Sequence, residues 1–135
     1  MSNYYVEYCW DTSSSVPVLW IVVSGKLLDD PRALATIIDQ AHLRANRDKD
    51  QTEVYLAYDF SATEGRLPLS YLMQWSHPCP KVKRVAMIGV RARIDEMAVL
   101  IMAAAKRVPY ECRFFETRED ARYFLSSHGL QDAVQ

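Results

Sequence analysis

The most constraining feature of the sequence is a continuously apolar run, Val18–Val23, inside a β-rich stretch from Val16 to Val23. A run of β-branched and aromatic residues of this length predicts a strand covered on both faces, and hence one that is central in a sheet. Helices must then pack against that sheet. The run therefore favours an α/β fold.

The remaining patterns alternate strands with helices. We expect strands at Tyr4–Trp10, Val16–Val23, Thr52–Tyr58, Lys83–Val90 and Glu111–Phe115. We expect helices from Asp29 or Asp30 to Arg47, from Leu69 to Trp75, from about Ile94 to Arg107, and from Thr117 to Gly129. A strand–helix–strand unit of this length favours parallel pairing. The expected architecture is a single mixed, mostly parallel sheet of about five strands with about four helices, forming one domain over residues 1–135.

Charge and hydropathy narrow the choice of partners and of compartment. Sixteen basic and seventeen acidic residues give a formal net charge of -1, so there is no overall field to hold a nucleic acid or an acidic membrane surface. No stretch is apolar for long enough to span a membrane, and the first residues lack a signal peptide, so we expect a cytoplasmic protein. Cys9, Cys79 and Cys112 are odd in number and widely spaced, which predicts buried free thiols.

Two segments carry a resemblance to a known family. Tyr55-Leu56-Ala57-Tyr58-Asp59-Phe60-Ser61 is similar to the central strand of the STAS domain, which ends in an Asp at the start of a functional loop. Phe114–Leu125 is similar to the final strand and helix of that domain, especially in the branch associated with the CRAL-TRIO lipid-binding fold. The order of elements also resembles the STAS domain, the fold of bacterial anti-sigma-factor antagonists. The resemblance implies a regulatory domain that binds a partner protein.

The sequence departs from that family in one respect. Phosphoregulated STAS proteins carry an Asp-Ser pair several residues beyond the strand-end Asp, and the stretch from Ser61 to Pro68 has no such pair. Ser61 and Thr63 remain candidate phosphoacceptors on the same predicted loop. A phosphate there would add about -1.5 to -2 charges at neutral pH, enough to change a docking surface.

Ligands of open α/β sheets bind near the carboxyl ends of the parallel strands. The loops there are expected to contribute Gly25 and Lys26, the segment Asp59–Ser61, and the pair Arg91 and Arg93. The two arginines precede a predicted helix N-terminus, where free amides attract anions, and they are the candidates for a phosphate or carboxylate contact. The alternative is that they are solvated loop charges.

The helix around Met97–Ala105 is apolar on most of its circumference, so something should cover its second face. Neighbouring helices, a homodimer interface and an apolar ligand pocket are the alternatives, with Met97 and Ile101 at the contact. The candidate lid over such a pocket comprises Leu69, Tyr71, Leu72, Met73 and Trp75. A short amphipathic helix that covers the sheet is the simpler interpretation of that segment.

Patterns for catalysis and for cofactors do not emerge. His77 and Cys79 have no further ligands to make a zinc site, no G-x-S-x-G elbow occurs, and no glycine-rich phosphate loop is present.

We therefore predict a non-enzymatic regulatory or interaction domain without cofactor or metal, which presents Asp59–Trp75 and the following helix to a regulatory protein or to a second copy. The alternative is a carrier or sensor of an apolar or amphipathic small molecule.

Overall fold

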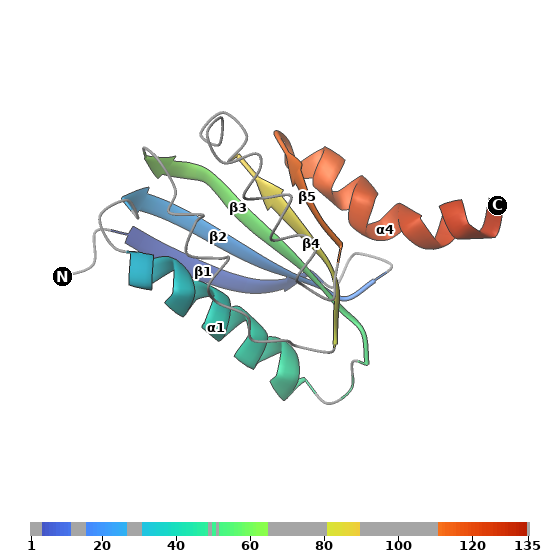
Figure 1. Cartoon of the computed structure of the whole chain (residues 1–135), viewed down its shortest axis with the longest axis horizontal. Coiled ribbons are helices and arrows are strands. Elements are labelled where there is room, and N and C mark those ends of the chain that lie inside the picture. Colours follow the sequence, from blue (N-terminus) through green and yellow to red (C-terminus); the bar gives the residue numbers. More distant parts are fainter. Residues whose placement is uncertain are drawn as a thin grey trace.

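The computed structural model describes residues 4–11, 16–26, 31–48, 50, 52–64, 81–89 and 111–134. These residues form five strands and two helices: β1 (Tyr4–Asp11), β2 (Val18–Lys26), α1 (Pro31–Arg47), β3 (Val54–Glu64), β4 (Val82–Ile88), β5 (Glu111–Phe115) and α4 (Arg118–Val134). The sheet order is β1-β2-β3-β4-β5 (Figure 1). β1 is antiparallel to β2, and the other three pairings are parallel. The predicted mixed, mostly parallel five-stranded sheet is thus confirmed.

Of the four predicted helices, the first and the last lie in the described residues as α1 and α4. The predicted helices at 69–75 and 94–107 lie outside the described residues. Within the described part of the chain, no helix is both long enough and apolar enough to cross a membrane.

β2 is buried on both faces, as the apolar run predicts. Leu19, Ile21 and Val23 point to the face that α1 covers. Val18 and Trp20 point to the opposite face, as do Ala57, Ala86 and Ile88 of the neighbouring strands. α4 covers that face. Figure 1 shows the two helices on opposite sides of the sheet. Alternating side chains of one strand therefore enter two separate cores.

Counted over the described residues, the core between α1 and the sheet is the larger of the two. The helix contributes Ala33, Ile37, Ile38, Ala41 and Ala45, and the strands contribute large apolar side chains such as Leu56 and Phe60.

At the end of α1, the ammonium of Lys81 donates to the carbonyl oxygens of Ala45, Asn46 and Asp48 at 3.5, 3.4 and 2.7 Å. Because the last carbonyls of a helix lack internal partners, this lysine ties the start of β4 to the end of α1.

Four details differ from the sequence-based expectation. β3 continues to Glu64, so the segment from Asp59 to Thr63 is strand and not loop. Gly25 and Lys26 likewise belong to β2, since that strand ends at Lys26. α4 passes through Gly129 and ends at Val134, because one glycine costs a helix only about 1 kcal/mol. Cys9 is exposed on β1 rather than buried, because β1 is an edge strand whose odd-numbered side chains face solvent.

Candidate functional site

The candidate site begins with a bulge in β3. The pairing of β3 with β2 shifts register between Val22 and Ser24, where Phe60 and Ser61 together oppose Val23. The pairing of β3 with β4 ends at Asp59, opposite Ile88. A bulge inserts one extra residue and turns the following side chains, and such bulges often lie beside functional sites. Here Ser61 and Ala62 become exposed directly after seven strand residues that are mostly buried.

Ser61 is exposed, yet its backbone is held closely by β4. Gly89 follows β4 with a φ of 82°, a conformation that favours glycine. A Cβ on Gly89 would lie 2.8 Å from the Ser61 Cα and 2.9 Å from its Oγ. The Gly89 amide donates to the carbonyl of Phe115 at 3.0 Å, which fixes this turn against β5. Glycine at this position therefore lets the Ser61 backbone approach the end of β4.

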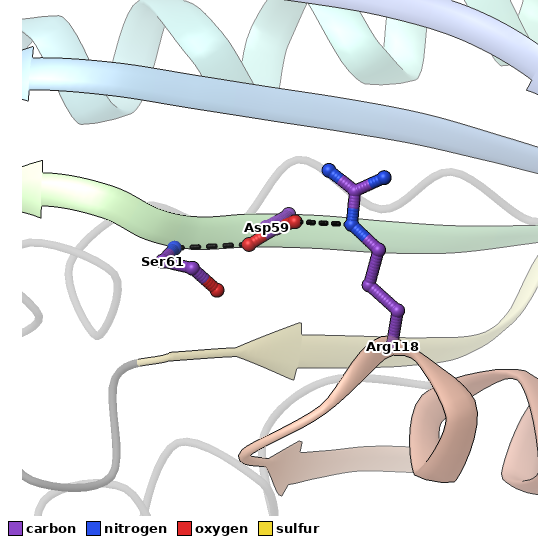
Figure 2. Close-up of polar contacts among 3 residues, drawn as sticks. All are labelled: Asp59, Ser61 and Arg118. Atoms are coloured by element: carbon purple, nitrogen blue, oxygen red, sulfur yellow. Dashed lines mark hydrogen bonds and ion pairs between the residues drawn. The ribbon is translucent and has the colours of Figure 1, made fainter.

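A second contact holds the Ser61 segment through Asp59 (Figure 2). One carboxylate oxygen of Asp59 accepts the Ser61 amide at 2.9 Å, and the other accepts the Arg118 Nε at 2.5 Å. The Asp59 side chain is 5% exposed, whereas that of Arg118 is 47% exposed. Burial alone would raise the pKa of Asp59, but hydrogen bonding from Ser61 and the bond and charge of Arg118 outweigh it and lower the pKa. The carboxylate is thus ionised at neutral pH and joins β3 to α4.

The position of Arg118 is set by the start of α4. The Thr117 hydroxyl accepts the Asp120 amide at 3.2 Å, an N-cap bond at the predicted start of this helix. Arg118 follows the cap, at the positive end of the helix dipole, where a cation is disfavoured. The Asp59 carboxylate offsets this cost.

Arginine side chains also contact a buried tryptophan at this end of the sheet. The Cζ atoms of Arg118 and Arg122 lie 5.4 and 5.1 Å from the centre of the Trp20 ring. Trp20 itself is 6% exposed. The site thus brings together β2, β3, the end of β4 and the first turns of α4.

Among the residues singled out from the sequence, Asp59, Ser61 and Thr63 can be located. Thr63 is buried, and its hydroxyl donates to the Phe60 carbonyl, so it is not accessible for modification in this fold. Ser61 is the exposed hydroxyl of the two candidates. The other candidates lie outside the described residues, namely Leu69, Tyr71, Leu72, Met73, Trp75, Arg91, Arg93, Met97 and Ile101. His77 and Cys79 lie there too, and the described residues contain no group of three or more potential metal ligands.

Sequence reasoning missed Gly89, Trp20 and the roles of Arg118 and Arg122. Arg118 carried a signal, since a basic residue directly after a helix cap must find an anion elsewhere. Gly89 carried a weaker one, as a lone glycine after an apolar strand. Nothing in the sequence distinguishes Trp20 from an ordinary core residue.

Comparison with known proteins bears on the fold. No protein-family model matches the chain, and no curated protein matches it. Among solved structures, it is similar to an uncharacterized protein of the DUF3478 family from Shewanella loihica PV-4, described as having a SpoIIAA-like fold. The two are 20% identical with a TM-score of 0.57, and the match covers 93% of this chain and 97% of the other. The chain therefore has a STAS-like fold, as the element order predicted.

Proposed function

We propose that this protein is a non-enzymatic regulatory domain of the STAS-like type, which binds a partner protein through the surface around Ser61. The observation that supports this most is the combination of exposure and rigidity at that serine. Its side chain is exposed, while its amide is bonded to Asp59 and its Cα lies against Gly89. A surface held in one conformation loses little entropy on binding, which favours specific recognition.

The same geometry makes Ser61 a candidate switch. A phosphoryl group on its hydroxyl would place about -1.5 to -2 charges near the Asp59 carboxylate. Repulsion from Asp59 and attraction to the half-exposed Arg118 would both act on the bond that joins β3 to α4. Modification at one residue would therefore alter the docking surface without a change of fold.

Site-specific photo-cross-linking in the native host tests this function. A photoreactive phenylalanine analogue replaces Ser61 in one variant and Leu43 in the control, because Leu43 is also exposed, at 41%, but lies on α1 and not on β3. The proposal predicts a discrete cross-linked protein from position 61 and none from position 43. Equal labelling from both positions, or none from position 61, would contradict it.

Mass spectrometry separates the related outcomes. Mass measured under denaturing conditions detects a phosphate on Ser61. Mass measured under native conditions detects a second copy of the chain or a retained small molecule. A self-cross-link from position 61 would make the partner another copy. A copurified lipid-like molecule together with no cross-link would instead favour a carrier of apolar ligands.

A further inference from the structure

Two arginine side chains lie over one buried indole at the start of α4. The Cζ atoms of Arg118 and Arg122 are within 5.4 Å of the centre of the Trp20 ring. They are four residues apart on the helix and so share one of its faces. Each guanidinium gains a cation–π interaction with the indole, but two like charges at this spacing repel each other. The arrangement gathers positive charge at one point of the surface.

The donors gathered there exceed what the neighbouring carboxylate accepts. Asp59 takes the Nε of Arg118, and the two terminal nitrogens of that arginine project away from Asp59 (Figure 2). Arg122 is exposed and forms no ion pair within the described part of the chain. The Trp20 indole nitrogen is buried and has no hydrogen-bond acceptor among the described residues. A guanidinium presents five N–H donors, so most of those on the two arginines remain available.

The nearby acidic side chains of α4 do not occupy the N–H donors of the two arginines. Glu119 and Asp120 are exposed in the first turn of α4, and neither forms an ion pair with Arg118 or Arg122 in the described part of the chain. Their charges offset the positive end of the helix dipole, so the proposed site depends on the hydrogen-bond donors of the two arginines and not on the dipole.

A second arginine pair, from β4 and β5, contacts α4 and shows what a structural role looks like. Arg84 and Arg113 lie over the Phe124 ring at 5.4 and 5.2 Å. Arg84 is 5% exposed and donates to the Phe124 carbonyl at 3.3 Å, so it ties β4 to the helix. Arg122 makes no corresponding bond to the strands that the structure describes. Its guanidinium stays at the surface, where it can meet a ligand.

We propose that Arg118 and Arg122 bind a phosphate or phosphoryl group above Trp20. Arginine binds phosphate through paired N–H donors in a geometry that lysine does not offer. Contact with the indole restrains both guanidinium groups before the ligand arrives, which lowers the entropy cost of binding. The proposal goes beyond the proposed function, because it names a ligand group and does not require Ser61 to contact a partner.

An NMR titration at pH 7 tests the proposal with inorganic phosphate as the probe. The Trp20 indole N–H signal, assigned by Trp20→Phe, reports on the site, and sodium chloride keeps the ionic strength constant. The signal should shift saturably with phosphate. Arg122→Gln should weaken the affinity about fivefold or more, the loss expected for one charge-assisted hydrogen bond. Arg47→Gln, at the exposed end of α1, should leave the affinity unchanged.

Arg118 needs a milder variant, because removing its charge would leave the buried Asp59 unpaired. Arg118→Lys keeps that charge but lacks the paired donors, so it should keep the fold and still weaken phosphate binding. An unchanged affinity in both Arg122→Gln and Arg118→Lys would overturn the proposal. The absence of a saturable shift up to about 50 mM phosphate would also overturn it.

The source of the phosphoryl group is resolved by a second titration with a short phosphoserine peptide. Equal affinity for peptide and phosphate, lost together in Arg122→Gln, supports a site for the phosphoryl group alone. Tighter binding of the peptide, also dependent on Arg122, supports a phosphorylated protein as the source. Peptide binding that Arg122→Gln leaves unchanged contradicts the proposal. The cross-linking test at Ser61 uses no phosphate, so the two proposals can fail separately.

Discussion

The two faces of the sheet are packed by different chemistry. The α1 face is filled by aliphatic and aromatic side chains, among them Ile21, Leu56 and Phe60 at 0% exposure. On the α4 face the buried strand residues include small alanines, and arginines lie over Trp20 and Phe124. Both faces thus have an apolar core, and the α4 face adds an arginine–aromatic layer formed by the arginines over Trp20 and Phe124. On the α1 face, Arg44 of the helix lies over the Tyr8 ring at 4.0 Å.

This difference separates stability from recognition. Burial of large apolar side chains is the main source of folding free energy, so the α1 face should dominate stability. Exposed arginines contribute little to stability but are effective at binding oxyanions and partner proteins. The Asp59–Arg118 bond lies on the side of the arginine–aromatic layer, and Asp59 also accepts the Ser61 amide. The predictions below test this separation.

The largest effect is expected on the α1 face. Leu56→Ala removes a fully buried side chain and should lower the free energy of unfolding by about 3 kcal/mol, through lost burial and a residual cavity. Urea unfolding followed by circular dichroism measures it. Leu43→Ala, at a 41% exposed position on α1, is the control and should stay within about 0.5 kcal/mol of the parent. Similar losses from both variants would refute the assignment of the dominant core.

The next effect is expected at Gly89. Gly89→Ala forces a Cβ against the Ser61 backbone at a positive φ, and should cost about 2 kcal/mol. Gly25→Ala shares the positive φ, 96°, and should cost about 1 kcal/mol. Urea midpoints of the two variants separate backbone strain from the close approach to Ser61. A Gly25 variant as unstable as the Gly89 variant would show that the approach contributes nothing.

A smaller effect is expected from the buried carboxylate. The pKa of Asp59 is lower in the folded chain than its ordinary value of 3.8, so its ionised form favours folding. That contribution is complete above pH 3.8 and is lost as the pH falls through the folded-state pKa. Because Arg118 is half exposed, Asp59→Asn should cost only about 1 kcal/mol at pH 7, and the cost should shrink in acid.

Urea unfolding at pH 7 and pH 3 measures this change in cost. Asp39→Asn, an exposed carboxylate on α1, is the control and should stay within about 0.5 kcal/mol of the parent at pH 7. A cost of Asp59→Asn that is constant between the two pH values would contradict the assigned role of the ionised carboxylate.

The smallest effect on stability is expected at Arg122. Its contact with Trp20 is an exposed cation–π interaction, so Arg122→Gln should change the free energy of unfolding by about 0.5 kcal/mol. Thermal and urea unfolding measure this. A loss approaching that of Leu56→Ala would mean that Arg122 has a structural role like that of the buried Arg84.

Much of the fold follows from short-range patterns in the sequence. The apolar run in β2, the proline at the start of α1 and the cap at Thr117 each act locally, and all lie where periodicity and capping rules place them. The predicted bounds of β5, Glu111–Phe115, match the observed ones. These elements were predictable because their determinants lie within a few residues of each other in the chain.

The site was predictable only in part, because its contacts join distant residues. The sequence identifies Asp59 and Ser61 as candidate site residues. It predicts a loop after Tyr58, because hydrophobic alternation fades there, whereas the strand continues. Pairing with β2 keeps it extended to Glu64, and such pairing leaves no local signature in the sequence. The partner of Asp59 lies 59 residues away in Arg118. Register and tertiary contact therefore decide the site.

The central claim is that the α1 face stabilises the fold and the arginine–aromatic side binds the partner. Hydrogen exchange, measured with and without the partner identified by cross-linking, tests this claim most directly. On partner binding, the account predicts slower exchange for amides from Ser61 to Glu64 and for the first turns of α4 from Arg118 to Arg122. It predicts no change for amides of α1. Protection confined to α1, with none at Ser61 or Arg118, would contradict the claim that the arginine–aromatic side of the sheet is the binding side.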